Sequence, residues 1–349
     1  MILEQRIASF VQLGKVLKSA GNEMEWKPEL KVSQEKYNQL IALFSTIHVY
    51  NGWFNKSNVV KSILAIGNML DEEKLNQWIS SYNLTKKKTE KKVAVIAAGN
   101  IPLVSFHDFV SVIISGNIFV GKLSKDDHLL LPSIAAILED IDPEIEKYIQ
   151  FITGKLENVD SVIATGSNNT ARYFDFYFGK YPNIIRKNRN SIGILDGSET
   201  KAELQELGQD IFSYFGLGCR NVSKIYIPKS FDLNRLFNAI YDFHPIKMHN
   251  KYANNYDYNK AVWLLNNEQL LDNEFILLKE DKSISSPVAS LYYERYNTKN
   301  DMEEILIDNA HNIQCIVSKN HVAFGKAQQP ELWDYADNID TMKFLLEDR

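Results

Sequence analysis

The spacing of apolar residues along the chain changes near residue 90. Before that point apolar residues recur mostly at three- and four-residue intervals, as they do on one face of a helix. Leu40, Leu43 and Phe44 follow this spacing, and so do Ile63 and Ile66. The pattern predicts a helical N-terminal region over residues 1–85 that packs on the rest of the protein. A charged run over residues 86–92 follows and is typical of a solvated connector.

Beyond this run, short apolar stretches alternate with helical patterns, as βα units require. The predicted strands cover residues 93–97, 118–123, 149–153, 161–164 and 192–195. A helix is predicted from Leu103 to Ile114, and another from an N-cap at Ser124 to Leu138. This order predicts a parallel, doubly wound sheet over residues 86–197, whose ligands bind beyond the carboxyl ends of the strands.

A second α/β unit is predicted over residues 198–318. Helical spacing is seen over residues 202–215, 233–240 and 260–265, and strand-like runs over 225–227, 275–278, 288–293 and 313–317. The last segment, residues 319–349, carries enough apolar residues, Trp333 and Phe344 among them, to pack back onto the body of the protein. The predicted fold class is therefore α/β.

Composition and charge narrow the possible partners. The chain has 349 residues, of which 45% are hydrophobic, enough for a sizeable core and two domains. Lys and Arg number 39 against 44 Asp and Glu, so charge gives no argument for a nucleic-acid partner. No apolar stretch reaches the length of a membrane span. Two cysteines in the whole chain are typical of a reducing compartment, so we predict a cytoplasmic protein, and we assign no metal site.

One of the two thiols lies in an unusual setting. Cys219 follows Gly216-Leu217-Gly218, between a predicted helix and a predicted strand. The glycines permit a sharp bend and the close approach of a substrate to the Cys219 N–H, which suits a nucleophile with a backbone oxyanion donor. Arg220 is a cation that could help stabilise a thiolate. The alternative is a structural thiol in apolar surroundings, as most intracellular cysteines are.

Three further candidates follow predicted strands. Asn100 lies in the turn Gly99-Asn100-Ile101-Pro102, and Lys122 ends the second strand. Thr165-Gly166-Ser167 lies between a strand and a helix, whose N-terminus could receive a pyrophosphate. Each candidate also has a purely structural interpretation, as a turn for Asn100 and for Gly166-Ser167, and as a solvated side chain for Lys122.

The order of these features resembles the aldehyde dehydrogenase superfamily. The patterns of that superfamily are Asn-Phe-Pro, Gly-Asn-x-x-x-x-Lys-Pro-Ser-Glu, Gly-Ser and Gly-Gln-x-Cys. This chain has the corresponding elements at Asn100, Gly116 to Ser124, Gly166-Ser167 and Gly216 to Cys219. Within the superfamily, residues 324–337 resemble the tail of the LuxC-like acyl-CoA reductases, which include the fatty-acid reductase of bacterial bioluminescence.

The resemblance implies an aldehyde dehydrogenase-like fold with a doubly wound nucleotide-binding domain, a catalytic α/β domain and, often, a homodimer. It implies NAD(P)H-dependent reduction of an acyl-CoA thioester to an aldehyde. In the catalytic roles that the resemblance implies, Cys219 is the acyl-accepting nucleophile, and Asn100 and the Cys219 N–H form the oxyanion hole. For the cofactor, it implies adenosine-ribose contacts from Lys122 and Ser124 and pyrophosphate contacts from Gly166 and Ser167.

Two departures from the superfamily pattern bear on the reaction. Hydrolytic aldehyde dehydrogenases carry Glu-Leu-Gly-Gly-Lys where this chain has residues 187–191, which contain no carboxylate to activate water. They also carry Glu-x-Phe-Gly-Pro-Val, which holds the nicotinamide ribose, where this chain has residues 283–288. The first departure favours CoA over water as the acyl partner. A hydrolytic dehydrogenase and a catalytically silent binding protein of the same fold stay open as alternatives.

The cofactor preference depends on one position. Lys125 stands where the superfamily pattern has an acidic residue that favours NAD. A cation beside Lys122 could pair with the 2'-phosphate of NADP, which predicts a preference for NADPH, with NADH as the alternative. Lys125 could instead point to solvent, where Asp126 and Asp127 partly cancel its charge.

Overall fold

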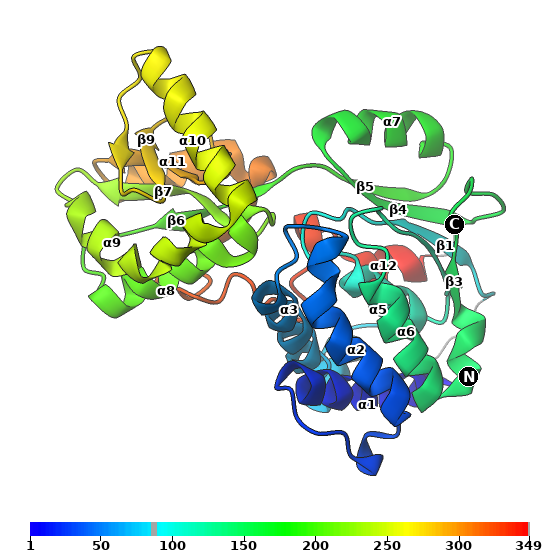
Figure 1. Cartoon of the computed structure of the whole chain (residues 1–349). Helices are drawn as coiled ribbons and strands as arrows, with labels where there is room; N and C mark the ends of the chain where they lie inside the picture. The colour runs from blue at the N-terminus through cyan, green and yellow to red at the C-terminus, as the bar shows by residue number, and fades with distance from the viewer. Residues whose placement is uncertain (85–88, 348–349) are drawn as a thin grey trace. The chain divides into compact units, whose positions relative to one another are not determined.

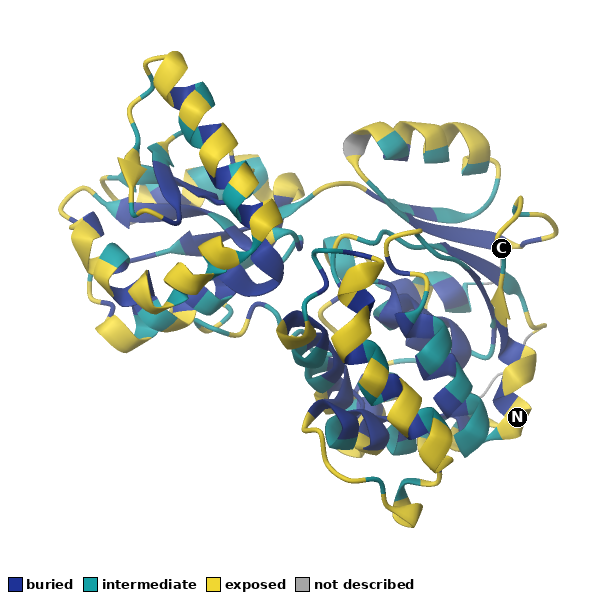
Figure 2. Cartoon of the chain, viewed as in Figure 1, coloured by how far each residue is buried: buried dark blue, intermediate teal, exposed yellow. Residues whose placement is uncertain are grey.

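The computed structural model describes residues 1–84 and 89–347 and confirms the α/β fold class. The chain forms two compact units, residues 1–187 with 330–349 and residues 188–329. Each unit has its own sheet, and Figure 2 shows the central strands of both sheets as mostly buried. The predicted boundary at residue 85 and part of the charged run lie outside the described residues. Within the described ranges, no helix is long and apolar enough to cross a membrane.

The sheet of the first unit has five parallel strands. They are β1 (Lys92–Ile96), β2 (Ile118–Lys122), β3 (Ile149–Phe151), β4 (Ser161–Thr165) and β5 (Asn183–Arg186). Their order is β3-β2-β1-β4-β5, so the chain winds outward from β1 to β3 and then returns to the other side of β1. This confirms a doubly wound sheet with its switch point between β1 and β4, where such sheets bind ligands.

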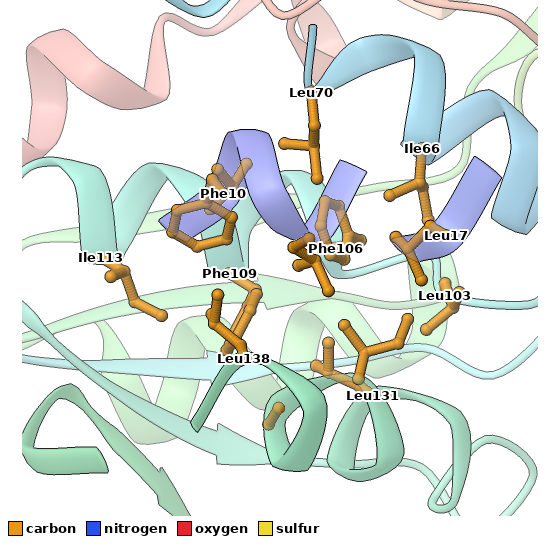
Figure 3. Close-up of a cluster of buried hydrophobic side chains, with 14 of the residues drawn as sticks. Phe10, Leu17, Ile66, Leu70, Leu103, Phe106, Phe109, Ile113, Leu131 and Leu138 are labelled. Atoms are coloured by element: carbon orange, nitrogen blue, oxygen red, sulfur yellow. The ribbon is translucent and has the colours of Figure 1, made fainter. Parts of the chain in front are cut away.

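Helices cover both faces of this sheet (Figure 1). They are α1 (Leu3–Gly21), α2 (Gln34–Thr46), α3 (Lys56–Met69), α4 (Glu72–Ser80), α5 (Phe106–Ile114), α6 (Leu130–Ile141), α7 (Asn168–Phe178) and α12 (Thr341–Leu346). α7 packs on one face through Phe174 and Phe178. On the other face, Phe10 of α1 shares a core with Phe109 of α5 and Leu138 of α6 (Figure 3). The N-terminal helices and the sheet are thus parts of one hydrophobic core.

The second unit is built around a six-stranded sheet. Its strands are β6 (Asn190–Ile194), β7 (Val222–Pro228), β8 (Leu271–Asp272), β9 (Leu277–Glu280), β10 (Ser290–Tyr296) and β11 (Ile313–Val317). The order is β11-β6-β7-β10-β9-β8, parallel except for the β8–β9 pair. Its helices are α8 (Lys201–Phe212), α9 (Leu233–Ile240), α10 (Asn250–Leu265) and α11 (Lys299–Asn309). Apolar residues of α8 and α9 pack on one face of the sheet, and those of α11 on the other.

The strand predicted over residues 192–195 belongs to the second sheet. It is β6, which pairs with β7 and β11, and the outer place in the first sheet is taken by β5. The two units therefore divide between Lys187 and Asn188, earlier than the predicted boundary after residue 197. An apolar run identifies a strand but not its neighbours, because pairing is decided by the fold. The β5 strand has only four residues and was missed in the sequence.

The predicted C-terminal segment, residues 319–349, is shared between the two units. Residues up to Gln329 belong to the second unit, and residues 330–349 belong to the first. There Leu332, Met342 and Leu345 are buried in the core. The Nε1 of Trp78 also donates a hydrogen bond of 2.6 Å to the hydroxyl of Tyr335.

Several helix boundaries differ from the predicted ones. α5 begins at Phe106 rather than Leu103, and α6 begins at Leu130 rather than after Ser124. The predicted helix over residues 260–265 is the end of the longer α10, and α11 was not predicted. The first two differences both lie at the carboxyl edge of the first sheet, where the chain makes turns before each helix.

Candidate active site

The turn that carries Asn100 follows β1, as predicted, and Asn100 is exposed. It lies against the turn that follows β2. A Cβ atom placed on Gly99 would come within 2.6 Å of the Oγ of Ser124, so only glycine permits this approach. Because β1 and β2 are parallel neighbours, their carboxyl ends bring Asn100 and Ser124 to the same edge of the sheet.

Polar side chains of the N-terminal region hold both turns. Asn51, which is buried, donates hydrogen bonds from Nδ2 to the carbonyl of Gly99 (3.3 Å) and to that of Asp126 (3.2 Å). The Oγ of Ser62, on α3, donates to the carbonyl of Pro102 (2.9 Å). Neither residue was singled out in the sequence, because an isolated polar residue in a helical region belongs to no motif.

Ser124 does not cap α6, contrary to the prediction. Its Oγ accepts a hydrogen bond of 3.2 Å from the N–H of Asp126 and so stabilises a local turn. Lys122 ends β2 as predicted, and its Nζ donates to the carbonyl of Gly154 (3.0 Å) in the loop after β3. Lys125 is exposed beyond the same strand. Two cations therefore lie close in sequence at this edge of the sheet.

The predicted strand–turn–helix at Gly166-Ser167 is present. β4 ends at Thr165, and Ser167 is the N-cap of α7, where its Oγ accepts a hydrogen bond of 3.2 Å from the N–H of Thr170. A Cβ atom on Gly166 would lie 3.0 Å from the ring of Phe174 and from the side chain of Thr170. The helix N-terminus next to β1 and β4 can receive an anion, so these residues fit the pyrophosphate of a nicotinamide cofactor.

The turn before Cys219 has strained backbone. α8 ends at Phe212, and Tyr214, Phe215 and Gly216 then have φ angles of 52°, 59° and 79°. The left-handed conformation costs roughly 1–2 kcal/mol for a residue other than glycine. Tyr214 and Phe215 are both 5% exposed, so their burial in the unit offsets this cost. Gly216 occupies the sharp bend that its sequence position predicts.

Asn221 links this turn to the end of α8. Its buried Nδ2 donates to the carbonyls of Asp210 (3.0 Å) and Ser213 (2.8 Å), and its Oδ1 accepts from the N–H of Gly218 (2.8 Å). Asp210, also buried, accepts from the N–H groups of Gly325 (2.7 Å) and Ala327 (2.9 Å). These bonds fix the conformation of residues 213–218, just before Cys219. No local pattern of residues indicates these hydrogen bonds.

Cys219 is partly buried, forms no disulfide, and lies between this turn and β7. The Oγ of Ser191 donates to the Cys219 carbonyl (3.0 Å) and also lies 3.0 Å from the Sγ of Cys315. The Nε of Arg220 donates to the carbonyl of Ala327 (2.7 Å). Arg220 is therefore held by the segment that leads out of the second unit.

The segment over residues 283–288 lies beside the same turn. A pocket is lined by Phe215 and Gly216 from the turn and by Ser286 and Val288 from the segment. The Oγ of Ser223 donates to the carbonyl of Ile284 (2.8 Å), which fixes the segment against β7. The structure thus places residues 283–288 next to the Cys219 turn.

An ion pair with one buried partner lies next to this segment. Lys224 is fully buried on β7, and its Nζ donates to the carbonyl of Lys282 (2.9 Å) and to Oε2 of Glu294 (2.6 Å). Burial lowers the pKa of Lys224, while the hydrogen bond and charge of Glu294 act in the opposite direction. Glu294 is 28% exposed, so it is the loss of Glu294 that would leave a buried charge, that of Lys224, without its ion-pair partner.

The candidate residues divide between the two units. Asn100, Lys122, Ser124, Lys125, Gly166 and Ser167 belong to the first unit, and Cys219 belongs to the second. In the described ranges, no group of three or more His, Cys, Asp or Glu side chains could hold a metal ion.

A comparison with protein families tests the resemblance that the sequence motifs predict. The family model for acyl-CoA reductase (LuxC) matches residues 11–234, more than half of the chain. This chain belongs to the acyl-CoA reductase (LuxC) family. The matched range contains all the candidate site residues, and the predicted resemblance is confirmed. Membership of the LuxC family supports an oxidoreductase that acts on aldehyde-type substrates.

Solved structures confirm the aldehyde dehydrogenase-like fold of this LuxC-family chain. It is similar to the indole-3-acetaldehyde dehydrogenase of P. syringae in complex with NAD+ and IAA, with a TM-score of 0.64 and 13% identity over 91% of this chain and 72% of that one. An oxidoreductase from Marinobacter aquaeolei gives a TM-score of 0.64 and 10% identity, over 91% and 73%. An NAD+ complex of an aldehyde dehydrogenase from Bacillus cereus gives 0.58 and 14%, over 91% and 72%. A comparison with curated proteins finds no match.

Proposed function

We propose that this LuxC-family chain reduces an acyl-CoA thioester to an aldehyde with a nicotinamide cofactor, through an acyl-enzyme on Cys219. The observation that carries the proposal is the strained turn before Cys219, held by Asn221, in a chain that matches the acyl-CoA reductase family. Strained backbone that the surrounding structure holds in place is common at functional sites.

The acyl transfer follows from the chemistry of a thiolate. The Sγ of Cys219 attacks the thioester carbonyl carbon and forms an S–C bond, while the carbonyl oxygen becomes an oxyanion. In the roles that the family resemblance implies, Asn100 and the Cys219 N–H would donate hydrogen bonds to that oxyanion. The C–S bond to CoA then breaks, CoA leaves as a thiolate that takes up a proton, and the acyl group stays on Cys219.

Reduction of the acyl-enzyme needs a nicotinamide cofactor. Lys122, Ser124, Gly166 and Ser167 would hold its nucleotide part, at the carboxyl edge of the first sheet. When bound, the reduced cofactor would supply a hydride to the thioester carbon, which gives the oxyanion of a hemithioacetal on Cys219. That adduct collapses, the S–C bond breaks, and the aldehyde leaves with regeneration of Cys219.

The hydrolytic alternative differs in the fate of the acyl group. Ser191 stands in the segment where hydrolytic relatives carry their Glu-containing pattern, and its hydroxyl is bonded to the carbonyl of Cys219. Residues 187–191 include no Asp or Glu, so this segment supplies no carboxylate to activate water. This observation favours CoA rather than water as the acyl partner.

The function is tested by following NADPH and NADH oxidation with acyl-CoA substrates of increasing chain length. The proposal predicts acyl-CoA-dependent oxidation with release of one aldehyde and one free CoA for each cofactor oxidised. Formation of acid from aldehyde and oxidised cofactor without added CoA would instead support the hydrolytic alternative. No turnover with any substrate, and iodoacetamide labelling of Cys219 that acyl-CoA does not protect, would support the catalytically silent alternative.

Lys125 is the residue that we propose to determine a preference for NADPH over NADH. We expect Lys125→Glu to raise the KM for NADPH about tenfold or more and to spare NADH, if one charge-assisted contact to the 2'-phosphate is lost. Steady-state kinetics with both cofactors measures this. Lys201→Glu, at another exposed lysine, is the control and should leave both KM values unchanged. A wild-type preference for NADH, or equal effects on both cofactors, would remove Lys125 from cofactor selection.

The assembly and compartment are also proposals. The family resemblance supports a homodimer, and α7 presents Tyr173, Phe176 and Tyr177 as exposed aromatic residues that a partner could cover. Neither cysteine of the chain forms a disulfide, which supports the reducing environment of the cytoplasm.

A further inference from the structure

Asp127 is a buried carboxyl group at the edge of the first sheet where Asn100 lies. It is 5% exposed and lies in the turn between β2 and α6. Its Oδ2 accepts a hydrogen bond of 2.7 Å from the N–H of Leu103. Its Oδ1 is buried without a hydrogen bond of good geometry, although the N–H of Leu130 is close enough to stabilise the charged form weakly. A buried carboxylate with an unpaired oxygen is costly, so this environment favours the neutral acid.

The bond from Leu103 matters because of where Leu103 lies. Its φ angle is 60°, and its side chain is 4% exposed. Figure 3 shows that side chain in the apolar cluster, near Leu17 and Leu131. The left-handed backbone turns the chain from the Asn100 turn into the core, and the N–H that this conformation presents is accepted by Asp127.

Three side chains thus form hydrogen bonds to the backbone of residues 99–103. Asn51 holds the carbonyl of Gly99, Ser62 holds that of Pro102, and Asp127 holds the N–H of Leu103. Asn51 and Ser62 cannot titrate. Asp127 is the one member of this set of three whose charge can change with pH.

The charges around Asp127 do little to stabilise its ionised form. In the part of the chain that the structure describes, no Lys or Arg forms an ion pair with it. Lys125, Asp126 and His128 precede or follow it in the turn and are exposed. Burial raises the pKa of Asp127 to about 7, and the smaller effects of the Leu103 N–H, His128 and the Leu130 N–H lower it.

We propose that Asp127 is a positioning residue that holds the Asn100 turn as a neutral carboxylic acid. Its ionisation leaves a buried charge with one unpaired oxygen, so the turn must open to admit water, and Asn100 loses its fixed position. The inference rests on the proposed function for its effect on activity. Its effect on stability is independent of that function.

The direction of the stability effect follows from the raised pKa. Between about pH 4 and pH 7 the folded protein keeps a proton that the unfolded chain has released. The stability that this proton contributes is therefore complete below about pH 4 and is lost as the pH rises to about 7. Asp127→Asn keeps an acceptor for the Leu103 N–H and cannot ionise. The melting temperature of Asp127→Asn should therefore increase relative to that of the wild type as the pH rises.

The test compares Asp127→Asn with the wild type and with Asp126→Asn, which changes the exposed neighbour. The difference in melting temperature between Asp127→Asn and the wild type should increase by roughly 5 °C or more from pH 5 to pH 8.5, while Asp126→Asn should follow the wild type. In acyl-CoA reduction, the kcat of the wild type should fall above about pH 7. Asp127→Asn should lack that fall and keep the KM for acyl-CoA within about twofold.

Each outcome decides a different point. If the melting temperatures of Asp127→Asn and the wild type change in parallel with pH, Asp127 is not held as the neutral acid and the inference fails. If the melting temperatures diverge but kcat falls equally in both proteins, Asp127 does not position the catalytic turn. If neither protein reduces acyl-CoA at any pH, the proposed function fails, while the melting temperatures still show whether Asp127 holds the turn as the acid.

Discussion

Replacing Cys219 with alanine is expected to abolish aldehyde formation from acyl-CoA, with a loss in rate of at least roughly 10⁴-fold, because the acyl group then has no nucleophile to receive it. The fold should be retained. The turn is fixed by Asn221 and by the burial of Tyr214 and Phe215, none of which involves the thiol. Cofactor oxidation measures the rate, and thermal unfolding measures the fold. Mass spectrometry should detect the acyl-enzyme in the wild type alone.

Cys315→Ala is the matched control, because Cys315 is the other cysteine of the chain and is also partly buried and outside any disulfide. It lies on β11, and its Sγ contacts the hydroxyl of Ser191. Its loss should cost about 1 kcal/mol of stability and change the rate by no more than a few-fold. Activity that survives Cys219→Ala and disappears in Cys315→Ala would show that the nucleophile is wrongly assigned.

Asn100→Ala is expected to lower kcat by about 10²–10³, the usual effect of removing one oxyanion donor. The effect on the KM for acyl-CoA should be smaller, because the hydrogen bond forms mainly in the transition state. Asn100 is exposed in its turn, so thermal stability should change little. Steady-state kinetics over a range of acyl-CoA concentrations separates the two parameters.

Asn100→Asp separates the catalytic role from a structural one. Aspartate forms turns as readily as asparagine, so the turn after β1 should persist. It lacks the amide donor, however, and its negative charge opposes the oxyanion. The rate should therefore fall at least as far as in Asn100→Ala. Near-normal activity of Asn100→Asp would make Asn100 a turn residue and remove it from the mechanism.

Much of the architecture could be predicted because it depends on local patterns. The strands β1, β2 and β4 appear within a residue or two of their predicted limits, since short apolar runs between turn residues identify strands. Ser167 lies between a strand and a helix, as predicted, and the structure shows it as the N-cap of that helix. Cys219 lies between a helix and a strand, where the sequence places it. Each of these features is determined by residues that are close together in the chain.

The tertiary structure decided what depends on distant segments. The apolar pattern of residues 192–195 predicts a strand but does not depend on which sheet that strand joins. Only its pairing with β7 and β11 places it in the second unit. The contacts of Asn51 and Asp127 cross 48 and 24 positions of the chain, and no local pattern records them. The cost of burying a charge is set by the surrounding fold. The sequence by itself therefore determined most of the strands of the first sheet and the candidate nucleophile. The fold decided which polar groups hold the Asn100 turn and which of them is kept neutral.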